Sequence, residues 1–255
     1  MSTLLLQDKV AVITGAGKGL GAAVARAYAG AGAKVIVSDI DAALARAVAE
    51  SLPGASAVSC DVRDPSQVEA LVAAAMAQHG RLDIMVPNAG VAGVVPLAQM
   101  SYAQWREVTS VNLDGVFLCI RYAAPVMVAA GSGSIITMCS ITAQAACPLI
   151  GHYAAAKAGV MSLTQTASTE LRGHGIRVNA ILPGFVDTDM VKARKRDFER
   201  LLGLPDFDAV VAQKQGRYGT PEEVAKLAVF LASPRSSFCT GGAYVVDGGA
   251  RASLL

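Results

Sequence analysis

The sequence predicts a doubly wound α/β fold of three layers, in which a seven-stranded parallel sheet lies between two layers of helices. Short apolar runs alternate with longer segments of helical spacing along the whole chain. Strands that alternate with helices form right-handed βαβ units, and such units give a parallel sheet covered on both faces. No linker, repeat or low-complexity tract divides the chain, so we expect a single domain over residues 1–255.

The seven expected strands are short apolar runs. They lie at residues 9–14, 34–39, 56–60, 82–86, 134–138, 176–182 and 243–246. Between them, helices are expected at residues 20–30, 42–51, 65–79, 102–129, 151–171 and 221–232.

Local signals mark where several of these helices begin or change. Asp41 is placed to cap the second helix, and Pro65 suits the first turn of the third. Thr220 precedes a proline and two glutamates, which is typical of a capped helix N-terminus. We expect the long helical region over 102–129 to be interrupted near Asn112.

The bulk composition argues against several classes of protein. Hydrophobic residues make up 53% of the chain, charged residues 16%, and the net charge is +2. This charge is too small to indicate binding to nucleic acid or to an anionic membrane. Residues 122–156 carry no Asp, Glu, Lys or Arg, but their several glycines and Pro148 are untypical of a membrane span.

The five cysteines form no CxxC pair, and the three histidines do not cluster with them. We therefore expect no metal site and no disulfide framework, and free thiols favour a reducing, cytoplasmic compartment. The first nine residues have no basic stretch before their short leucine run, so we expect no signal peptide.

A glycine-rich turn joins the first strand to the first helix and contains Gly15, Lys18, Gly19, Leu20 and Gly21. Glycines let the backbone approach a pyrophosphate, whose charge is stabilised by the free N–H groups of the following helix. The spacing is T-G-x-x-x-G-x-G rather than G-x-G-x-x-G. The turn favours a dinucleotide site, but a glycine-rich loop can also serve packing alone.

Asp39 ends the second strand, 18 residues after Gly21, where an acidic side chain can bind ribose hydroxyls. A carboxylate there would repel the 2′-phosphate of NADP, so NAD is the favoured cofactor and NADP the less favoured one. Lys18 acts against this choice, because a cation in the glycine turn could contact that phosphate. Asp39 is given more weight, since Lys18 can swing into solvent.

Further candidate binding residues follow the third and fourth strands. Asp61 and Val62 follow the third strand, where an adenine ring would lie, and Asn88, Ala89 and Gly90 follow the fourth. Open α/β sheets bind ligands at these carboxyl ends of their strands.

Tyr153 and Lys157 lie four residues apart in a predicted helix, so their side chains share one face. A positive charge beside a phenol favours the phenolate and lowers the pKa of the tyrosine. The pair would then exchange a proton nearer neutral pH, where general acid–base catalysis is most efficient. His152 points about 100° away from Tyr153, so we expect it to pack or to line a pocket.

With these pieces placed, the chain resembles the short-chain dehydrogenase/reductase family over nearly its whole length. The joint match is specific, whereas each motif alone is not. The matched motifs are Thr14–Gly21, Asp61, Asn88–Gly90, Asn112, Ser140, Tyr153-x-x-x-Lys157 and Pro183–Gly184. The resemblance implies a Rossmann domain, a nicotinamide cofactor, and hydride transfer between that cofactor and a secondary alcohol or ketone.

The resemblance also implies the roles of individual residues. Ser140 would hydrogen-bond the substrate oxygen, and Tyr153 would pass a proton to or from it. Lys157 would lower the pKa of Tyr153 and bind the nicotinamide ribose, and Asn112 would hold a water that relays protons. The loop that would contact the nicotinamide contains Pro183, Gly184, Val186 and Thr188.

Residues 187–217 lack an expected strand and carry a basic run at residues 192–196, so we expect a helical substrate lid there. Cys147 and Pro148 are expected to line the substrate pocket, and the apolar residues around them favour an uncharged substrate. Pro87 departs from the family, which usually has asparagine there, but Asn88 is expected to keep its structural role. The resemblance further implies a homotetramer.

Two alternatives stay open at this point. An NADPH-dependent reductase of 3-oxoacyl thioesters, carried by acyl carrier protein or coenzyme A, is favoured by Lys18 and the basic run but opposed by Asp39. A catalytically silent NAD-binding or scaffold protein is opposed by the complete set of Asn112, Ser140, Tyr153 and Lys157.

Overall fold

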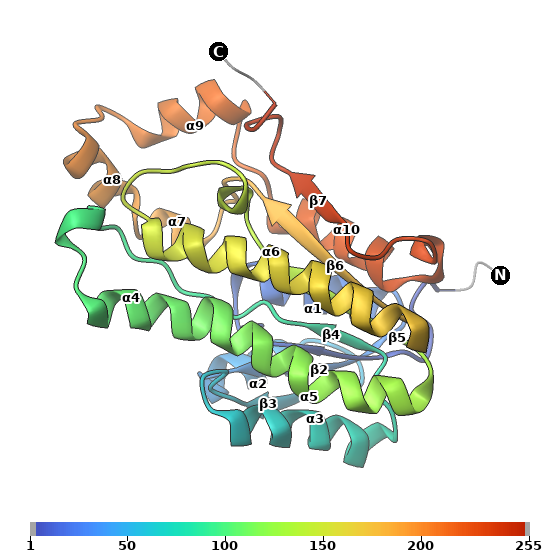
Figure 1. The fold of residues 1–255 in the computed structure, drawn as a ribbon. Coiled ribbons are helices and arrows are strands. Elements are labelled where there is room, and N and C mark those ends of the chain that lie inside the picture. The colour runs from blue at the N-terminus through green and yellow to red at the C-terminus, as the bar shows by residue number, and fades with distance from the viewer. Residues whose placement is uncertain (1–3, 253–255) are drawn as a thin grey trace.

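The structure, a computed structural model, describes residues 4–252, so the first and last three residues of the predicted domain lie outside it. Within these residues one seven-stranded sheet has the order β3-β2-β1-β4-β5-β6-β7, with every neighbouring pair parallel (Figure 1). The predicted fold class is confirmed. The strands are β1 (Val10–Ile13), β2 (Lys34–Asp39), β3 (Ser56–Ser59), β4 (Ile84–Val86), β5 (Gly133–Met138), β6 (Ile176–Pro183) and β7 (Ala243–Val246).

Helices cover both faces of this sheet. The long ones are α1 (Gly19–Gly30), α2 (Ala42–Glu50), α3 (Pro65–His79), α4 (Tyr102–Thr109), α5 (Gly115–Ala130), α6 (Gly151–Leu171) and α10 (Pro221–Ala232). The segment between β6 and α10 holds α7 (Asp189–Lys192), α8 (Lys195–Leu202) and α9 (Phe207–Gln215). Short 3-10 turns are η1 (Leu97–Gln99), η3 (Ile141–Ala143), η4 (Arg172–His174) and η5 (Pro234–Ser236).

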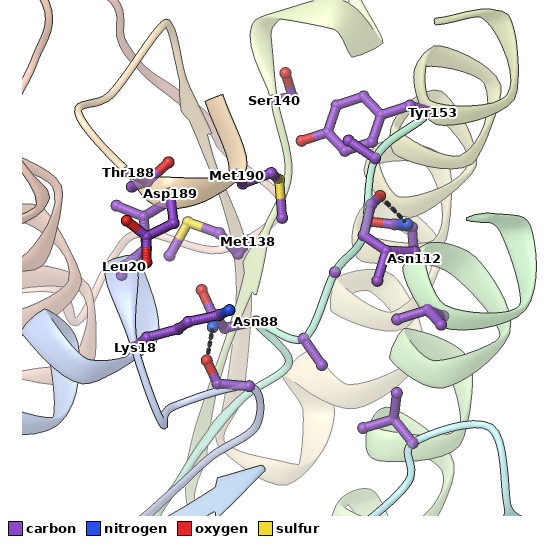
Figure 2. Close-up of a pocket in the computed structure, with 18 of the residues that line it drawn as sticks. Lys18, Leu20, Asn88, Asn112, Met138, Ser140, Tyr153, Thr188, Asp189 and Met190 are labelled. Atoms are coloured by element: carbon purple, nitrogen blue, oxygen red, sulfur yellow. Dashed lines mark hydrogen bonds between the residues drawn. The ribbon is translucent and has the colours of Figure 1, made fainter. Parts of the chain in front are cut away.

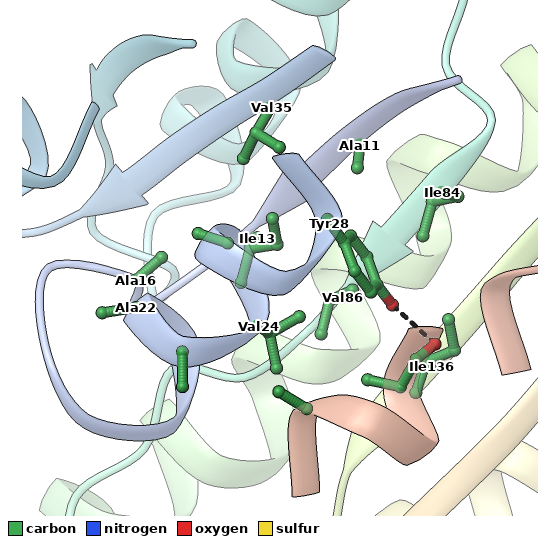
Figure 3. Packing of buried hydrophobic residues seen from close by; sticks show 14 of the residues in the cluster. Ala11, Ile13, Ala16, Ala22, Val24, Tyr28, Val35, Ile84, Val86 and Ile136 are labelled. Carbon is green, nitrogen blue, oxygen red and sulfur yellow. Dashed lines mark hydrogen bonds between the residues drawn. The ribbon is translucent and has the colours of Figure 1, made fainter. Parts of the chain in front are cut away.

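The alternation of side chains along each strand divides the core into two layers. Ala11 and Ile13 face a cluster formed with α1, α2 and α10, whereas Val10 and Val12 face one formed with α3, α5 and α6. Because both faces of β1 are buried, all four of its residues are apolar. Tyr28 of α1 is fully buried, and its hydroxyl donates to a backbone carbonyl of α10 at 3.1 Å (Figure 3).

The predicted helix starts are confirmed by capping hydrogen bonds. The Asp41 carboxylate accepts from two backbone N–H groups in the first turn of α2, and Asp64 caps α3 ahead of Pro65. Thr220 and Glu223 form a reciprocal capping box at α10. These caps fix where each helix leaves the loops at the carboxyl edge of the sheet.

The predicted interruption near Asn112 is a π-helical turn, η2 (Ser110–Asp114), which joins α4 to α5 without ending the helical path. A π turn accommodates an extra residue in the helix, and such turns occur often at functional sites. Asn112 is fully buried within this turn.

The helical path from Tyr102 to Ala130 is apolar and long enough to cross a membrane by length and composition alone, and 33% of its most apolar window is buried. The core helix of a soluble protein passes the same test. Here α5 packs against α3 and α6 over the sheet, and Arg106 forms an ion pair with Asp114 at 2.7 Å. The stretch is therefore one element of the helical layer.

A third apolar cluster lies apart from the two layers and is called the lid cluster below. Its buried members are Ile150, Phe198, Phe207 and Val211. The rings of Phe198 and Phe207 stack with centroids 5.1 Å apart. The cluster holds α8 and α9 against the start of α6, so residues 187–217 form a helical cover without a strand, as predicted.

Candidate active site

A cavity of about 740 Å³ lies at the carboxyl edge of the sheet, where the strand order reverses between β1 and β4. Open α/β sheets bind ligands at such a switch point. Loops that follow six of the strands meet there. The predicted site residues that line the cavity are Gly15, Lys18, Gly19, Leu20, Asp39, Asp61, Val62, Asn88, Ala89, Gly90, Asn112, Ser140, Tyr153, Lys157, Pro183, Gly184, Val186 and Thr188.

Gly21 was predicted to bind the cofactor, and the structure places it behind the cavity wall instead. A Cβ atom on Gly21 would lie 2.4 Å from the Gly15 carbonyl oxygen and 2.5 Å from Asn88 Nδ2. Gly21 is therefore needed for the close packing of α1 against the turn rather than for contact with a ligand.

The glycine turn is shaped to receive an anion. Gly15 has φ +60°, and a Cβ there would lie 2.6 Å from Ala89 Cα, so no larger residue fits. The Asn88 side chain donates to the carbonyls of Thr14 and Gly15 at 2.9 and 3.0 Å, as expected despite Pro87. Since α1 has no side-chain cap, its first N–H groups are left for a ligand such as pyrophosphate.

Asp39 is held rigidly at one end of the cavity. Its Oδ2 accepts from Gly17 N at 2.9 Å, and its Oδ1 accepts from Asp41 N at 3.1 Å. A Cβ on Gly17 would lie 2.9 Å from that Oδ2, so glycine permits this contact. A carboxylate anchored by two backbone groups suits a ribose diol and disfavours a phosphate.

Arg63 lines the cavity beside Asp61, and the sequence patterns did not indicate it. Its guanidinium donates to both carboxylate oxygens of Asp61, with Nη2 to Oδ2 at 2.6 Å. This hydrogen bonding lowers the pKa of Asp61 below its usual range. Asp61 therefore stays ionised and fixed in orientation at the cavity wall.

The hydroxyl of Ser140 is oriented by Thr142. Ser140 Oγ accepts hydrogen bonds from Thr142 N at 3.2 Å and from Thr142 Oγ1 at 3.0 Å. With both acceptor positions of Ser140 in use, its proton is free to be donated elsewhere. Figure 2 shows the Tyr153 hydroxyl turned toward Ser140 in the cavity.

Lys157 is 3% exposed, and its Nζ donates to the Met138 carbonyl at 2.8 Å while lying 5.5 Å from the centroid of the Tyr153 ring. Burial lowers the pKa of Lys157 to about 8. Burial around the phenol raises the pKa of Tyr153 to about 12, partly offset by a hydrogen bond with Ser140. The predicted lowering of the Tyr153 pKa by Lys157 is thus not seen, because desolvation by burial is the largest influence on this phenol.

The side-chain oxygen of Asn112 is a buried acceptor without a hydrogen-bond donor among the described residues. The Nδ2 atom of Asn112 donates to the carbonyls of Val91 and Val108 at 2.8 and 2.9 Å. Its Oδ1 has no hydrogen-bond partner among the residues of the structure. A buried oxygen of this kind calls for a donor, and the cavity wall is where a water could supply one.

Comparisons with known proteins agree with this geometry. The profile of the family described as "Enoyl-(Acyl carrier protein) reductase" matches residues 15–251. The cis-4-hydroxycyclohexanecarboxylate dehydrogenase of Sinomonas cyclohexanicum is 42% identical, over 95% of this chain and 96% of that protein. This chain belongs to the short-chain dehydrogenase/reductase family. Members of this family are oxidoreductases that act on alcohols and ketones and bind NAD or NADP.

Two further relatives match this chain over nearly its whole length. The 3-oxoacyl-[acyl-carrier-protein] reductase of Thermotoga maritima is 38% identical, over 96% of this chain and 98% of that protein. A solved short-chain dehydrogenase/reductase from Mycobacterium marinum superposes with a TM-score of 0.90 at 35% identity, covering 98% of both chains. Relatives of similar identity thus carry the names of different substrates.

In this short-chain dehydrogenase/reductase, the cover over the cavity contributes wall residues that sequence reasoning missed. These are Asp189, Met190, Val191, Ala193 and Arg194. The sequence placed them only within the predicted lid and did not single them out, since α7 is too short to show a periodic pattern. By contrast, Cys147 and Pro148 do not line the cavity, because Cys147 packs on the lid cluster.

His152 of the dehydrogenase/reductase packs as expected rather than lining the cavity. It is 1% exposed, and a Cβ on Gly93 would lie 2.8 Å from its Nε2. Its Nδ1 accepts from Tyr153 N at 3.0 Å. His152 therefore serves as an acceptor in the uncapped first turn of α6, next to Tyr153.

Proposed function

We propose that this protein interconverts a secondary alcohol and a ketone and prefers NAD over NADP. The observation that carries the proposal is the convergence of Ser140, Tyr153 and Lys157 on one cavity whose opposite end holds the glycine turn and Asp39. NAD bound along that wall would supply the acceptor or donor of the hydride.

The proton chemistry follows from the hydrogen bonds. Ser140, relieved of its acceptor capacity by Thr142, donates to the substrate oxygen. Tyr153 gives a proton to that oxygen in ketone reduction and takes one in alcohol oxidation. Lys157 places a cation close to the Tyr153 ring, where it stabilises the phenolate when the proton has left. The free Oδ1 of Asn112 would bind a water that returns protons to solvent.

The test of this function is an NAD-reduction screen over secondary alcohols, followed by Tyr153→Phe. We expect the variant to lose on the order of 1,000-fold in kcat, because the group that moves the proton is gone. NADH binding, followed by fluorescence titration, should persist. A variant with full activity would overturn the mechanism, and a wild-type protein that binds NADH but converts no alcohol or ketone would favour the silent scaffold alternative.

The preference for NAD has its own test at Asp39. In the Asp39→Ser variant the like-charge contact with a 2′-phosphate is removed, so we expect the ratio of kcat/KM for NAD over NADP to fall at least about tenfold. NADPH dissociation constants measured on the same proteins should decrease in parallel. An unchanged ratio would mean that Asp39 does not discriminate between the 2′-hydroxyl of NAD and the 2′-phosphate of NADP.

The second candidate function is an NADPH-dependent reductase of 3-oxoacyl thioesters. The name of the Thermotoga maritima relative and the cation at Lys18 support it, and the description of the matching family also refers to acyl carrier protein, although to the reduction of an enoyl group. The anchored carboxylate of Asp39 opposes it. Turnover of acetoacetyl coenzyme A with NADPH compared with NADH separates the two functions.

We also propose that residues 187–217 act as a substrate lid and that the protein is a cytoplasmic homotetramer without nucleic-acid or membrane partners. Lid residues on the cavity wall support the first point, and the free cysteines suit a reducing compartment. Phe117, on the apolar path of α5, is 49% exposed and would be covered in an assembly. Light scattering that gives the 26.1 kDa mass of one chain would exclude the tetramer.

A further inference from the structure

The lid brings into the cavity a charged side chain that the proposed reaction does not use. Arg194 lines the cavity and is half-buried. Its backbone N–H donates to the Val191 carbonyl at 3.0 Å, so it lies one helical turn after Met190 and Val191. Residues three and four apart on such a turn share a face, and both of these neighbours also line the cavity.

This face of the lid lies toward the catalytic end of the cavity. Val191 and Tyr153 both pack against the lid cluster. Figure 2 shows the Met190 side chain on the side of Ser140, whereas Asp189, the other charged lid residue on the wall, follows Thr188, which lies close to Gly19 of the glycine turn. Arg194 therefore belongs with the substrate end, and Asp189 with the cofactor end.

Several cations of the lid have acidic partners, whereas Arg194 has none among the residues that the structure describes. Lys192 pairs with Asp187 at 2.6 Å, Lys195 pairs with Asp208, and Arg200 pairs with Asp197. Among the residues that the structure describes, neither Arg194 nor Arg196 makes an ion pair. Arg196 is exposed and lies outside the cavity wall, so Arg194 alone is both unpaired and directed at the substrate end.

The chemistry of a guanidinium in such a place selects its ligand. An arginine that is partly removed from water gains most from a planar anion, because its N–H groups form two parallel charge-assisted hydrogen bonds with a carboxylate. Val91, Ala92 and Met190 on the cavity wall are apolar, and none of the carboxylates on that wall forms an ion pair with Arg194.

We propose that Arg194 binds a carboxylate of the substrate. The substrate class is then a secondary alcohol or ketone whose carboxylate is separated from the reacting carbon by an apolar skeleton. This inference rests on the proposed function. It replaces the sequence-based expectation of an uncharged substrate, which drew on Cys147 and its apolar neighbours in the lid cluster.

Matched alcohols test the proposal by kinetics. The ratio of kcat/KM for 4-hydroxycyclohexanecarboxylate over cyclohexanol should be well above one in the wild-type protein. In Arg194→Met this ratio should fall on the order of 10- to 100-fold, as for loss of a charge-assisted hydrogen bond. Arg196→Met removes the same charge outside the cavity and should keep the wild-type ratio. A ratio that is unchanged in Arg194→Met, or equally reduced in Arg196→Met, would overturn the proposal.

A binding experiment separates this proposal from the proposed function. Cyclohexanecarboxylate has no hydroxyl to react, so its dissociation constant from the NADH-bound protein is measured calorimetrically without turnover. It should bind the wild-type and Arg196→Met proteins and bind Arg194→Met at least about tenfold more weakly. Equal binding to all three overturns the proposal even if alcohols are oxidised. Weaker NADH binding by Arg194→Met would instead assign Arg194 to a cofactor phosphate.

Discussion

Thr142 controls the direction in which the Ser140 hydroxyl points. It donates both its N–H and its Oγ1 to Ser140 Oγ, at 3.2 and 3.0 Å. A serine whose acceptor positions are filled in this way has its own proton left for the substrate oxygen. Thr142 itself does not line the cavity, so it acts as a positioning residue through Ser140.

The Thr142→Val variant should therefore lower kcat by about fivefold to tenfold, because one hydrogen bond to Ser140 is lost without a change in side-chain shape. KM should change little. Thr142→Ser keeps the hydroxyl and should restore kcat. Steady-state kinetics of the three proteins on one alcohol check this, and equal kcat values in all three would show that Ser140 needs no orienting partner.

Residue types and spacings predicted most of this site. Asp39 and Asn88 were found because parallel strands bring their carboxyl ends together, and Tyr153 was found from its spacing to Lys157. The extent to which individual side chains are buried could not be predicted from the sequence. The raised pKa of Tyr153 and the position of Gly21 behind the wall depend on how closely α6 and α1 pack, which no local pattern reports.

The contact between the π turn and α6 is the element on which the position of Asn112 depends. A Cβ on Gly159 of α6 would lie 2.9 Å from Leu113 Cδ1 in that turn. Close approach at Gly159 lets the turn sit against α6, so that Asn112 and Tyr153 face the same cavity.

Gly159→Val should therefore separate the two elements, lowering the free energy of unfolding by about 1–3 kcal/mol as in an overpacked core. Activity should fall further than stability alone explains, since Asn112 moves. Gly173→Val is the matched control, because nothing lies within 4 Å of a Cβ there. Denaturant unfolding and kcat on both variants check the prediction, which is wrong if the two variants behave alike.

The lid was predicted as a helical segment, but the bounds of its three helices were not predicted. Its cluster joins Phe185, Phe198 and Phe207, which are far enough apart in sequence to show no period. Helices α8 and α9 are held by this tertiary packing, and their contacts with the cavity follow from it.

At the scale of the whole molecule, the buried thiols make folding sensitive to alkali. Burial raises the pKa of Cys60 to about 11 and that of Cys119 to about 12, against an ordinary value of 9.0. As pH rises above 9, the unfolded chain loses these protons while the folded chain keeps them, so stability falls. Lys157 acts in the opposite direction between about pH 8 and 10.5, because its pKa is lowered on folding.

With two thiols and the Tyr153 phenol against one amine, we expect Tm to fall between pH 9 and 11. Cys119→Ala should have a lower Tm at pH 7, from the cavity it leaves, but a shallower fall of Tm with pH. Calorimetric scans at several pH values check this. A slope equal to that of the wild-type protein would show that the Cys119 thiol does not couple to folding.

The lid cluster separates the lid from the rest of the molecule, and the two parts differ in how freely their sequences can change during evolution. The wall of the cavity is built from the loops that follow six strands. A substitution in one of these loops therefore disturbs the neighbouring loops. The lid rests on a small core of its own, which shares Tyr153 with the rest of the site. Selection can therefore change the sequence of α7 to α9 while the catalytic residues are retained. In this way one fold can come to act on chemically unrelated substrates.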